Sequence, residues 1–588
     1  METLPPAAAP SDAASLGIAA FHREPLRREP LHREQIRRAV IGGSAAAAAY
    51  FAAVCLLFGG WVHFFYAGHY GGPLMISTLL GISEASVRAG AHPVYEPPQA
   101  GWDGQYYYMQ AKDPLLENDY SDGRLFDLPS YRYTRNGLPL LAKAASMLIG
   151  KPLVTPWVYF TTQFFFAAAG FGLLVAWLVY HRRPWYWALV WGLYGGVLRP
   201  MLHGLPDPTA DALFLVSILA ALDGRLWLYT AAASVLCLCR ESYAAPAAVL
   251  WAMTVAGKFD WRGQAGYYTR IAATAVPGVV VLGWAFYVAN QLNTEVLAGS
   301  RHFPWGALVD WPFKAYLACL WSDITSEVPV GSRRDIVQAT SCALCLLVVF
   351  AIVLKQVRHS VKFAPLVPHI LLMTMTGYIV WDGGLGFFKN ASSVVLLGVV
   401  LLPRTPSKLL RGSLLFTFVA GLQFVHTHDW SHLNFTPPLA AVPLNPPIIG
   451  QAAIVPTPPT LDYQSRVELV GREAEEPAYR GPFAPWHRSP GLVVIRITNT
   501  SSVAWPATMP GVDAISLGVK FCKGDRLEFE DRLPLYKAVP VGETIDYRVR
   551  VPVRSDGLMP NTLYVGMIHD AHRWFSLEDP CQILAVPY

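Results

Sequence analysis

Apolar runs separated by short polar segments extend over residues 39–430. About 20 consecutive apolar residues suffice to cross a bilayer as a helix, and the first run is longer than that. The runs 209–222 and 226–239 are short, so they form either a re-entrant pair or tilted helices, and the count stays open by about two. The pattern predicts a polytopic α-helical membrane protein with about eleven transmembrane helices. The predicted spans are 39–66, 155–180, 185–202, 209–222, 226–239, 243–257, 270–290, 336–356, 364–381, 391–403 and 408–427.

Positive charge is concentrated in one set of the segments between these runs, and short basic loops lie on the cytoplasmic side of membrane proteins. The sequence therefore predicts a cytoplasmic N-terminus, an external C-terminus, and external positions for residues 67–154 and 291–335. Residues 1–38 are predicted to be a disordered or loosely helical basic tail, and contact with anionic lipid headgroups is the alternative. The basic segments are 23–38, 181–183, 258–270, 355–362 and 404–411.

The chain changes character after the last apolar run. Residues 431–461 are rich in proline, which is typical of a semi-rigid spacer. Residues 462–588 contain alternating apolar and polar positions separated by turn residues, and this pattern predicts an antiparallel β-sandwich. Cys522 and Cys581 lie in this region and are candidates for a disulfide on the oxidising side of the membrane, with two unpaired thiols as the alternative.

Composition supports the membrane assignment. Of the 588 residues, 53% are hydrophobic and 15% are charged, whereas a soluble protein carries about 25% charged residues. Low hydrophobicity and high charge mark a disordered chain, and this chain has neither. A net charge of +5 is too small to indicate a nucleic-acid partner, so the predicted environment is the lipid bilayer.

The first external segment, 67–154, is longer than an ordinary connection, and such length is typical of functional loops. It contains Gly101-Trp102-Asp103-Gly104-Gln105-Tyr106-Tyr107-Tyr108. A carboxylate between aromatic residues near the membrane surface predicts Asp103 as a catalytic base, with Trp102, Tyr106 and Tyr107 as a platform for a sugar ring. A turn aspartate within an aromatic membrane-interface belt is the alternative.

Together with the later Tyr131-Arg132-Tyr133 and Arg135, this motif resembles the first external loop of GT-C glycosyltransferases, in particular a bacterial branch tied to cell-surface glycopolymers. GT-C enzymes are polytopic and take a sugar from a polyprenyl- or dolichyl-phosphate donor. The resemblance implies that Asp103 is the catalytic carboxylate and that Gln105 and Tyr131 contact substrate. Many GT-C enzymes have two adjacent acids here, whereas this chain has Asp103-Gly104, so Asp113 and Asp127 are the candidates for a second acid.

A lipid-phosphate leaving group requires cations, and the planar guanidinium of arginine suits phosphate. Arg132 and Arg135 are the first candidates because they share the motif loop, and Arg240 and Lys389 are further substrate-binding candidates. For Arg132 and Arg135, stacking on an aromatic ring or anchoring at the membrane interface is the alternative. Arg240 has an alternative role in an ion pair with Glu241 or Asp211, and Lys389 has one as a surface lysine. No metal-ligand spacing is present and no cofactor is predicted, although the sequence leaves open whether a divalent metal takes part.

These features predict an enzyme of a bacterial inner membrane that moves a sugar from a polyprenyl-phosphate donor to a surface glycan or lipid-linked acceptor on the external face. One alternative is a polymerase or ligase that uses a lipid-diphosphate-linked glycan. The other is a non-enzymatic flippase or transporter, which should carry charge near mid-bilayer and repeated halves.

The C-terminal sandwich resembles the Ig-like modules beside bacterial polysaccharide enzymes through Trp505-Pro506 and Trp574-Phe575. It is predicted to hold the acceptor glycan or a partner at the external surface, with a structural cap as the alternative.

Overall fold

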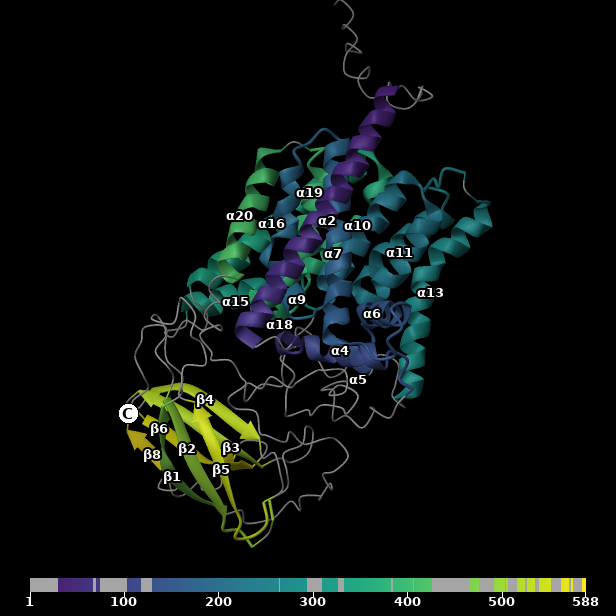
Figure 1. The fold of residues 1–588 in the computed structure, drawn as a ribbon. Coiled ribbons are helices and arrows are strands. Elements are labelled where there is room, and N and C mark those ends of the chain that lie inside the picture. The colour runs from purple at the N-terminus through teal and green to yellow at the C-terminus, as the bar shows by residue number, and fades with distance from the viewer. Residues whose placement is uncertain are drawn as a thin grey trace, which may run out of the picture.

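The computed structural model is a helical protein with a region of β-strands at its C-terminal end (Figure 1). In the helical part it describes residues 30–66, 70–74, 103–117, 129–263, 265–292, 309–325, 333–381, 384–405 and 407–425. In the C-terminal part it describes residues 465–474, 491–502, 504–505, 515–523, 526–534, 539–550, 562–569, 573–574 and 584–587. The predicted linker 431–461 lies outside the described residues.

Four helices of the described chain are long and apolar enough to cross a membrane, within Arg33–His63, Pro156–Tyr180, Tyr267–Gln291 and Ile336–His359. The protein is therefore a helical membrane protein, as predicted. The shorter helices pack beside these four and complete a buried apolar core. The helices that form the bundle are α2 (Pro30–Tyr66), α7 (Pro156–Tyr180), α10 (Asp207–Asp223), α11 (Leu226–Cys239), α12 (Ala244–Val255), α13 (Tyr267–Gln291), α16 (Arg333–His359), α17 (Leu366–Thr374), α19 (Gly384–Leu401) and α20 (Lys408–Phe424).

Two of the predicted spans are not single helices. The run 185–202 is divided into a 3-10 turn η3 (Trp185–Ala188), α8 (Leu189–Gly192) and α9 (Gly195–Leu202), and its residues are largely buried. The run 364–381 is divided into α17 and α18 (Tyr378–Trp381), because an isolated β-bridge between Val309 and Thr376 ends α17. Both runs are apolar because they pack inside the protein, and apolarity alone does not distinguish that environment from lipid.

The predicted N-terminal tail is also shorter than expected. Helix α2 begins at Pro30, so residues 30–38 extend the first long helix rather than belonging to the tail. Within this extension Glu34 pairs with Arg37 and Arg38, one turn away along the helix. The apolar remainder of α2 packs along α7 for much of its length (Figure 1).

The loop between α2 and α7 folds into short helices at one end of the bundle, where α2 finishes (Figure 1). We call this end the loop end. The short elements there are η2 (Gly72–Leu74), α4 (Asp103–Lys112), α5 (Pro129–Tyr133) and α6 (Gly137–Leu148). A further short helix, α15 (Lys314–Thr325), packs beside α16 and α18.

The C-terminal strands form two antiparallel sheets, with the order β1-β2-β5 in one and β4-β3-β6-β7 in the other, where β8 also pairs with β6. Strands β2, β3, β5 and β6 coincide with the four alternating runs of the sequence, and β1 lies near β6 and β8 of the other sheet. An Ig-like identity for this region stays a prediction. The strands are β1 (Ser465–Ala474), β2 (Gly491–Asn499), β3 (Ile515–Lys523), β4 (Arg526–Pro534), β5 (Thr544–Arg550), β6 (Thr562–His569), β7 (Arg573–Trp574) and β8 (Leu584–Pro587).

Candidate functional site

Two glycines fix the loop helices against the bundle. A Cβ on Gly104, the second residue of α4, would lie 1.7 Å from the carbonyl oxygen of His203, at the end of α9. A Cβ on Gly137, the first residue of α6, would lie 2.4 Å from Sγ of Cys239, at the end of α11. Only glycine allows backbones to approach this closely. The two contacts place the start of α4 and the start of α6 beside the ends of helices of the bundle.

Asp103 is the first residue of α4, and two cations lie on its carboxylate. Nη1 of Arg132, from α5, is 3.0 Å from Oδ1 of Asp103, and Nζ of Lys389, from α19, is 3.9 Å from Oδ2. The guanidinium of Arg132 also lies over the ring of Tyr106, 4.3 Å from its centroid. We call Asp103, Arg132 and Lys389 the Asp103 cluster, and it joins α4 and α5 of the motif loop to α19, which is far away in the sequence.

The carboxylate of this cluster is charged and partly open. The surrounding protein desolvates Asp103 and so raises its pKa, but the charges of Arg132, Lys389 and Arg135 outweigh that effect and hold the pKa below its ordinary value. Asp103 is therefore ionised at neutral pH. Its side chain retains 42% of its exposure, compared with 10% for Arg132 and 21% for Lys389, so a ligand can reach the carboxylate.

Arg135 is held by a different acid. Its Nε and Nη2 donate to the two carboxylate oxygens of Glu241, at 2.9 Å and 2.6 Å, and its guanidinium lies 4.8 Å from the centroid of the Tyr131 ring. Desolvation raises the pKa of Glu241, but the charge and hydrogen bonds of Arg135 lower it to about 2. This bidentate pair ties the motif loop to the 3-10 turn η4 (Glu241–Tyr243) between α11 and α12.

A second cluster lies beside this pair, at the start of α10. Nη1 of Arg240 is 2.9 Å from Oδ1 of Asp207, and Nη2 of Arg240 donates to Oδ1 of Asn390 at 2.6 Å. Asn390 in turn donates from Nδ2 to the carbonyl of Gly386 in α19. We call Asp207, Arg240 and Asn390 the Asp207 cluster. The predicted pairing of Arg240 with Glu241 or Asp211 is wrong, because the extended backbone of Arg240 at the end of α11 directs it to Asp207, and Glu241 binds Arg135 instead.

One helical turn after Asp207 in α10, a layer of buried polar groups begins at Asp211 and extends into the bundle. The carboxylate of Asp211 accepts hydrogen bonds from Nε1 of Trp191 at 3.1 Å and from the hydroxyl of Tyr243 at 3.3 Å. The ring of Tyr243 stacks on His369 with centroids 4.8 Å apart, and Nε2 of His369 lies 3.0 Å from Oγ of Ser393. This layer holds α10, η4, α17 and α19 together beneath the two clusters.

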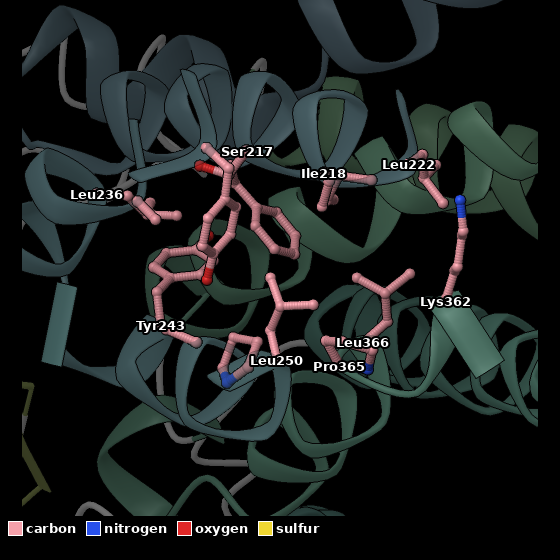
Figure 2. A pocket seen from close by; sticks show the side chains of 15 residues that line it. Ser217, Ile218, Leu222, Leu236, Tyr243, Leu250, Lys362, Pro365 and Leu366 are labelled. Atoms are coloured by element: carbon pink, nitrogen blue, oxygen red, sulfur yellow. The ribbon is translucent and has the colours of Figure 1, made fainter. Parts of the chain in front are cut away.

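An apolar groove begins at Tyr243. It is lined by α10, α11, α12 and α17, with Tyr243 near one end and Lys362 at the other (Figure 2). The space not filled by atoms is about 500 Å³, part of which is open to the surroundings. Since Tyr243 also binds Asp211, the groove reaches the polar layer below the Asp207 cluster.

The structure brings most of the predicted site residues together. Arg132, Arg135, Arg240 and Lys389 all lie around Asp103 or are linked to its neighbours. Gln105 is completely buried, and Tyr106 and Tyr107 are 2% exposed, so in this structure Tyr106 supports Arg132 instead of offering a ring to solvent. The proposed sugar platform therefore stays a prediction.

Other predicted residues lie elsewhere or outside the described chain. Asp113 follows α4, about 15 Å from Asp103 along the helix, where its Oδ1 accepts the backbone N–H of Glu117 at 3.0 Å. That position does not suit a second acid beside Asp103. Trp102, Asp127 and Cys581 lie outside the described residues, and only the backbone of Cys522 is described, in β3. Within the described chain no group of three His, Cys, Asp or Glu side chains is placed to hold a metal ion.

Comparison of the chain with protein-family models, with curated proteins and with solved structures found no match. The chemistry of the site therefore rests on its geometry.

Sequence reasoning missed several residues of the site, among them Asn390, Trp191 and His369. Asn390 follows Lys389 in the polar start of an apolar run, and polar residues at membrane depth are functional candidates by default. That signal could have found Asn390. Trp191 and His369 carried no such signal, because one polar atom on a ring within an apolar run is more often part of the core.

Proposed function

We propose that the chain is a membrane glycosyltransferase of the GT-C type, which transfers a sugar from a polyprenyl-phosphate donor to a cell-surface glycan or a lipid-linked acceptor. One observation carries the proposal: Asp103, the partly exposed carboxylate of the motif loop, lies against Arg132 and Lys389 at one end of a helical membrane bundle. Arg135 and Arg240 lie next to that cluster. A site of this composition combines a base with cations that suit a phosphate leaving group.

The proposed reaction uses Asp103, Arg132 and Lys389. Asp103 accepts the proton of the acceptor hydroxyl while the acceptor oxygen forms a bond to the anomeric carbon of the sugar. The bond between that carbon and the phosphate oxygen breaks, and its electron pair stays on the phosphate. Arg132 and Lys389 stabilise the charge that develops there. Attack opposite the leaving group inverts the configuration of the anomeric carbon.

The groove supports a lipid-linked donor. It is lined mainly by apolar side chains, such as Leu236 and Leu250, and Tyr243, three residues after Arg240 in the sequence, lies near one end of it (Figure 2). A prenyl chain in the groove would place its phosphate near the cations of the site. Burial of hydrocarbon in such a groove stabilises a complex in proportion to the apolar area removed from its surroundings.

The proposal includes a location. We place the chain in a bacterial inner membrane with about eleven spans, its N-terminus in the cytoplasm, and its loop end and C-terminal region on the external face. Arg182, Lys258 and Lys362, in the short segments that join helices away from the loop end, support that orientation. The C-terminal strands would then form an Ig-like module that holds the acceptor outside the membrane.

Transfer can be measured with purified protein in nanodiscs, a panel of polyprenyl-phosphate sugars, and cell-envelope extract as the acceptor. Wild-type protein should release polyprenyl phosphate, and Asp103→Asn should reduce the rate about a hundredfold, the usual contribution of a general base. Asp223→Asn is the matched control, because it makes the same change at the opposite end of α10 from Asp207, and it should leave the rate unchanged.

The remaining outcomes separate the alternatives. Equal release by wild-type protein and Asp103→Asn would remove Asp103 from the chemistry and leave Asp127 as the acid to test. Release from lipid-diphosphate-linked glycans alone would identify a polymerase or ligase, for which the additional cations Arg135 and Arg240 could serve the second phosphate. Movement of lipid-linked glycan across the membrane without any release would identify a transporter.

A further inference from the structure

The carboxylate of Asp103 is occupied in this structure. Arg132 lies 3.0 Å from one of its oxygens and Lys389 lies 3.9 Å from the other. Two charged groups therefore compete with an acceptor hydroxyl for the oxygens that a base must offer, and their positive charges also lower the affinity of the carboxylate for a proton. In this state Asp103 is a weak base.

The cations that occupy Asp103 also suit a phosphate group. Arg132 presents a planar guanidinium and Lys389 an ammonium, and both bind phosphate oxygens well. The neighbouring cations are held more firmly. Arg135 has two hydrogen bonds to Glu241 at 2.9 Å and 2.6 Å, and Arg240 contacts Asp207 at 2.9 Å. Lys389, at 3.9 Å from its carboxylate, has the longest of these contacts and is the easiest to displace.

We infer that Arg132 and Lys389 are shared between Asp103 and the phosphate of the donor, so that donor binding takes these cations from Asp103 and frees its carboxylate for the acceptor hydroxyl. This inference rests on the proposed function for the identity of the donor, but the exchange itself requires only a phosphate group. Among the described residues, the charged and titratable groups that face Asp103 are Arg132 and Arg135 from the α5 region, Lys389 from α19, and Tyr107 from α4.

The exchange implies an order in which the two substrates bind. Before the donor binds, Asp103 is paired with the two cations and is a poor acceptor for the proton of the acceptor hydroxyl. After the donor binds, its phosphate pairs with the cations and the carboxylate of Asp103 is released. Donor should therefore bind before acceptor. Asp103 should also oppose donor binding, because it competes with phosphate for the same cations.

That competition gives a test that does not depend on turnover. Binding of two probes, inorganic phosphate and polyprenyl phosphate, would be measured by calorimetry on the full chain in nanodiscs. Asp103→Asn should bind both probes about fivefold more tightly than wild-type protein, which is the effect of removing one partly exposed ionic competitor. Lys389→Gln should weaken binding of both probes. The double variant with both changes should bind more weakly than Asp103→Asn, and Asp223→Asn should match wild-type protein.

Each outcome separates the exchange from the proposed function. Tighter binding of inorganic phosphate to Asp103→Asn, without binding of polyprenyl phosphate to any form, would support the exchange and overturn the lipid donor. Binding of polyprenyl phosphate that is equal or weaker in Asp103→Asn would overturn the exchange and leave the donor in place. Absence of saturable binding of both probes to all forms would overturn both. If Asp103→Asn does not fold, unchanged phosphate binding by Lys389→Gln would overturn the exchange by itself.

Discussion

The Asp103 cluster and the Asp207 cluster contain similar groups in different surroundings. Each has one aspartate and one arginine in direct contact, at 3.0 Å and 2.9 Å, and each draws a third residue from α19. The side chain of Asp103 is 42% exposed, whereas that of Asp207 is 6% exposed. The third contact is a long ion pair to Lys389 in one cluster and a 2.6 Å hydrogen bond to Asn390 in the other.

Because of this difference, the two clusters are expected to have different roles. A buried ion pair that also satisfies its remaining hydrogen bonds holds one arrangement, because breaking it leaves a charge without compensation. A pair whose carboxylate is partly exposed contributes less to stability, and that carboxylate remains open to a ligand. The Asp207 cluster is therefore expected to support the site, and the Asp103 cluster is expected to act on substrate. Three predictions sharpen or break this comparison.

The largest effect is expected from Asp207→Asn. It leaves Arg240 buried without its charge partner, and removing one partner of a buried pair costs about 3–5 kcal/mol of unfolding free energy. The same change at Asp103 should cost less, about 1 kcal/mol, because its carboxylate is 42% exposed and water can reach the guanidinium of Arg132 in its place. Denaturant unfolding in detergent micelles, followed by tryptophan fluorescence, measures both values.

A double variant separates the loss of the charge pair from the loss of side-chain packing. Asp207→Asn combined with Arg240→Gln removes both charges and should recover part of the stability, since two neutral partners can replace a buried pair at small cost. Equal unfolding free energies for Asp207→Asn and Asp103→Asn would contradict the division between a supporting and an acting cluster.

A smaller effect is expected from Asn390→Ala. The side chain of Asn390 accepts from Arg240 and donates to the carbonyl of Gly386, and hydrogen bonds to charged groups contribute about 1.5–3 kcal/mol. Unfolding free energy should fall by about 2 kcal/mol. Gln356→Ala is the control, because Gln356 makes a neutral hydrogen bond to Thr405, and it should cost about 1 kcal/mol. An equal loss in the two variants would show that the charge of Arg240 adds nothing to the Asn390 contact.

The two clusters also differ in how far the sequence predicted them. Asp103, Arg132 and Arg135 could be predicted because they share one motif loop, and the apolar runs predicted most of the bundle helices. The pairing of Arg240 with Asp207 could not be predicted, because it depends on where α11 ends relative to the start of α10. The sequence left Glu241 and Asp211 open as partners of Arg240, and in the structure Glu241 is held by the bidentate bond from Arg135. The broken helices at 185–202 were missed for a related reason, since burial against protein and burial in lipid select the same residues.

The smallest effect concerns pH and the pair that lies between the two clusters. Desolvation raises the pKa of Glu241, but the charge and hydrogen bonds of Arg135 lower it to about 2, compared with an ordinary value of 4.5. Because the pKa is lower in the folded state, the stability from this pair is fully present above about pH 4.5 and is lost as the pH falls toward about 2. The side chain of Glu241 is 44% exposed, so solvent screening limits this contribution to about 1 kcal/mol.

Glu241→Gln should therefore lower the unfolding free energy by about 1 kcal/mol near pH 6, and its difference from wild-type protein should shrink steadily as the pH falls below about 4.5. Arg135→Gln should remove the same pH-dependent component, because the pKa of Glu241 is lowered mainly by that arginine. A difference between wild-type protein and Glu241→Gln that stays constant across this range would mean that the Arg135–Glu241 contact carries no net electrostatic stabilisation, and that the motif loop is held to η4 by packing alone.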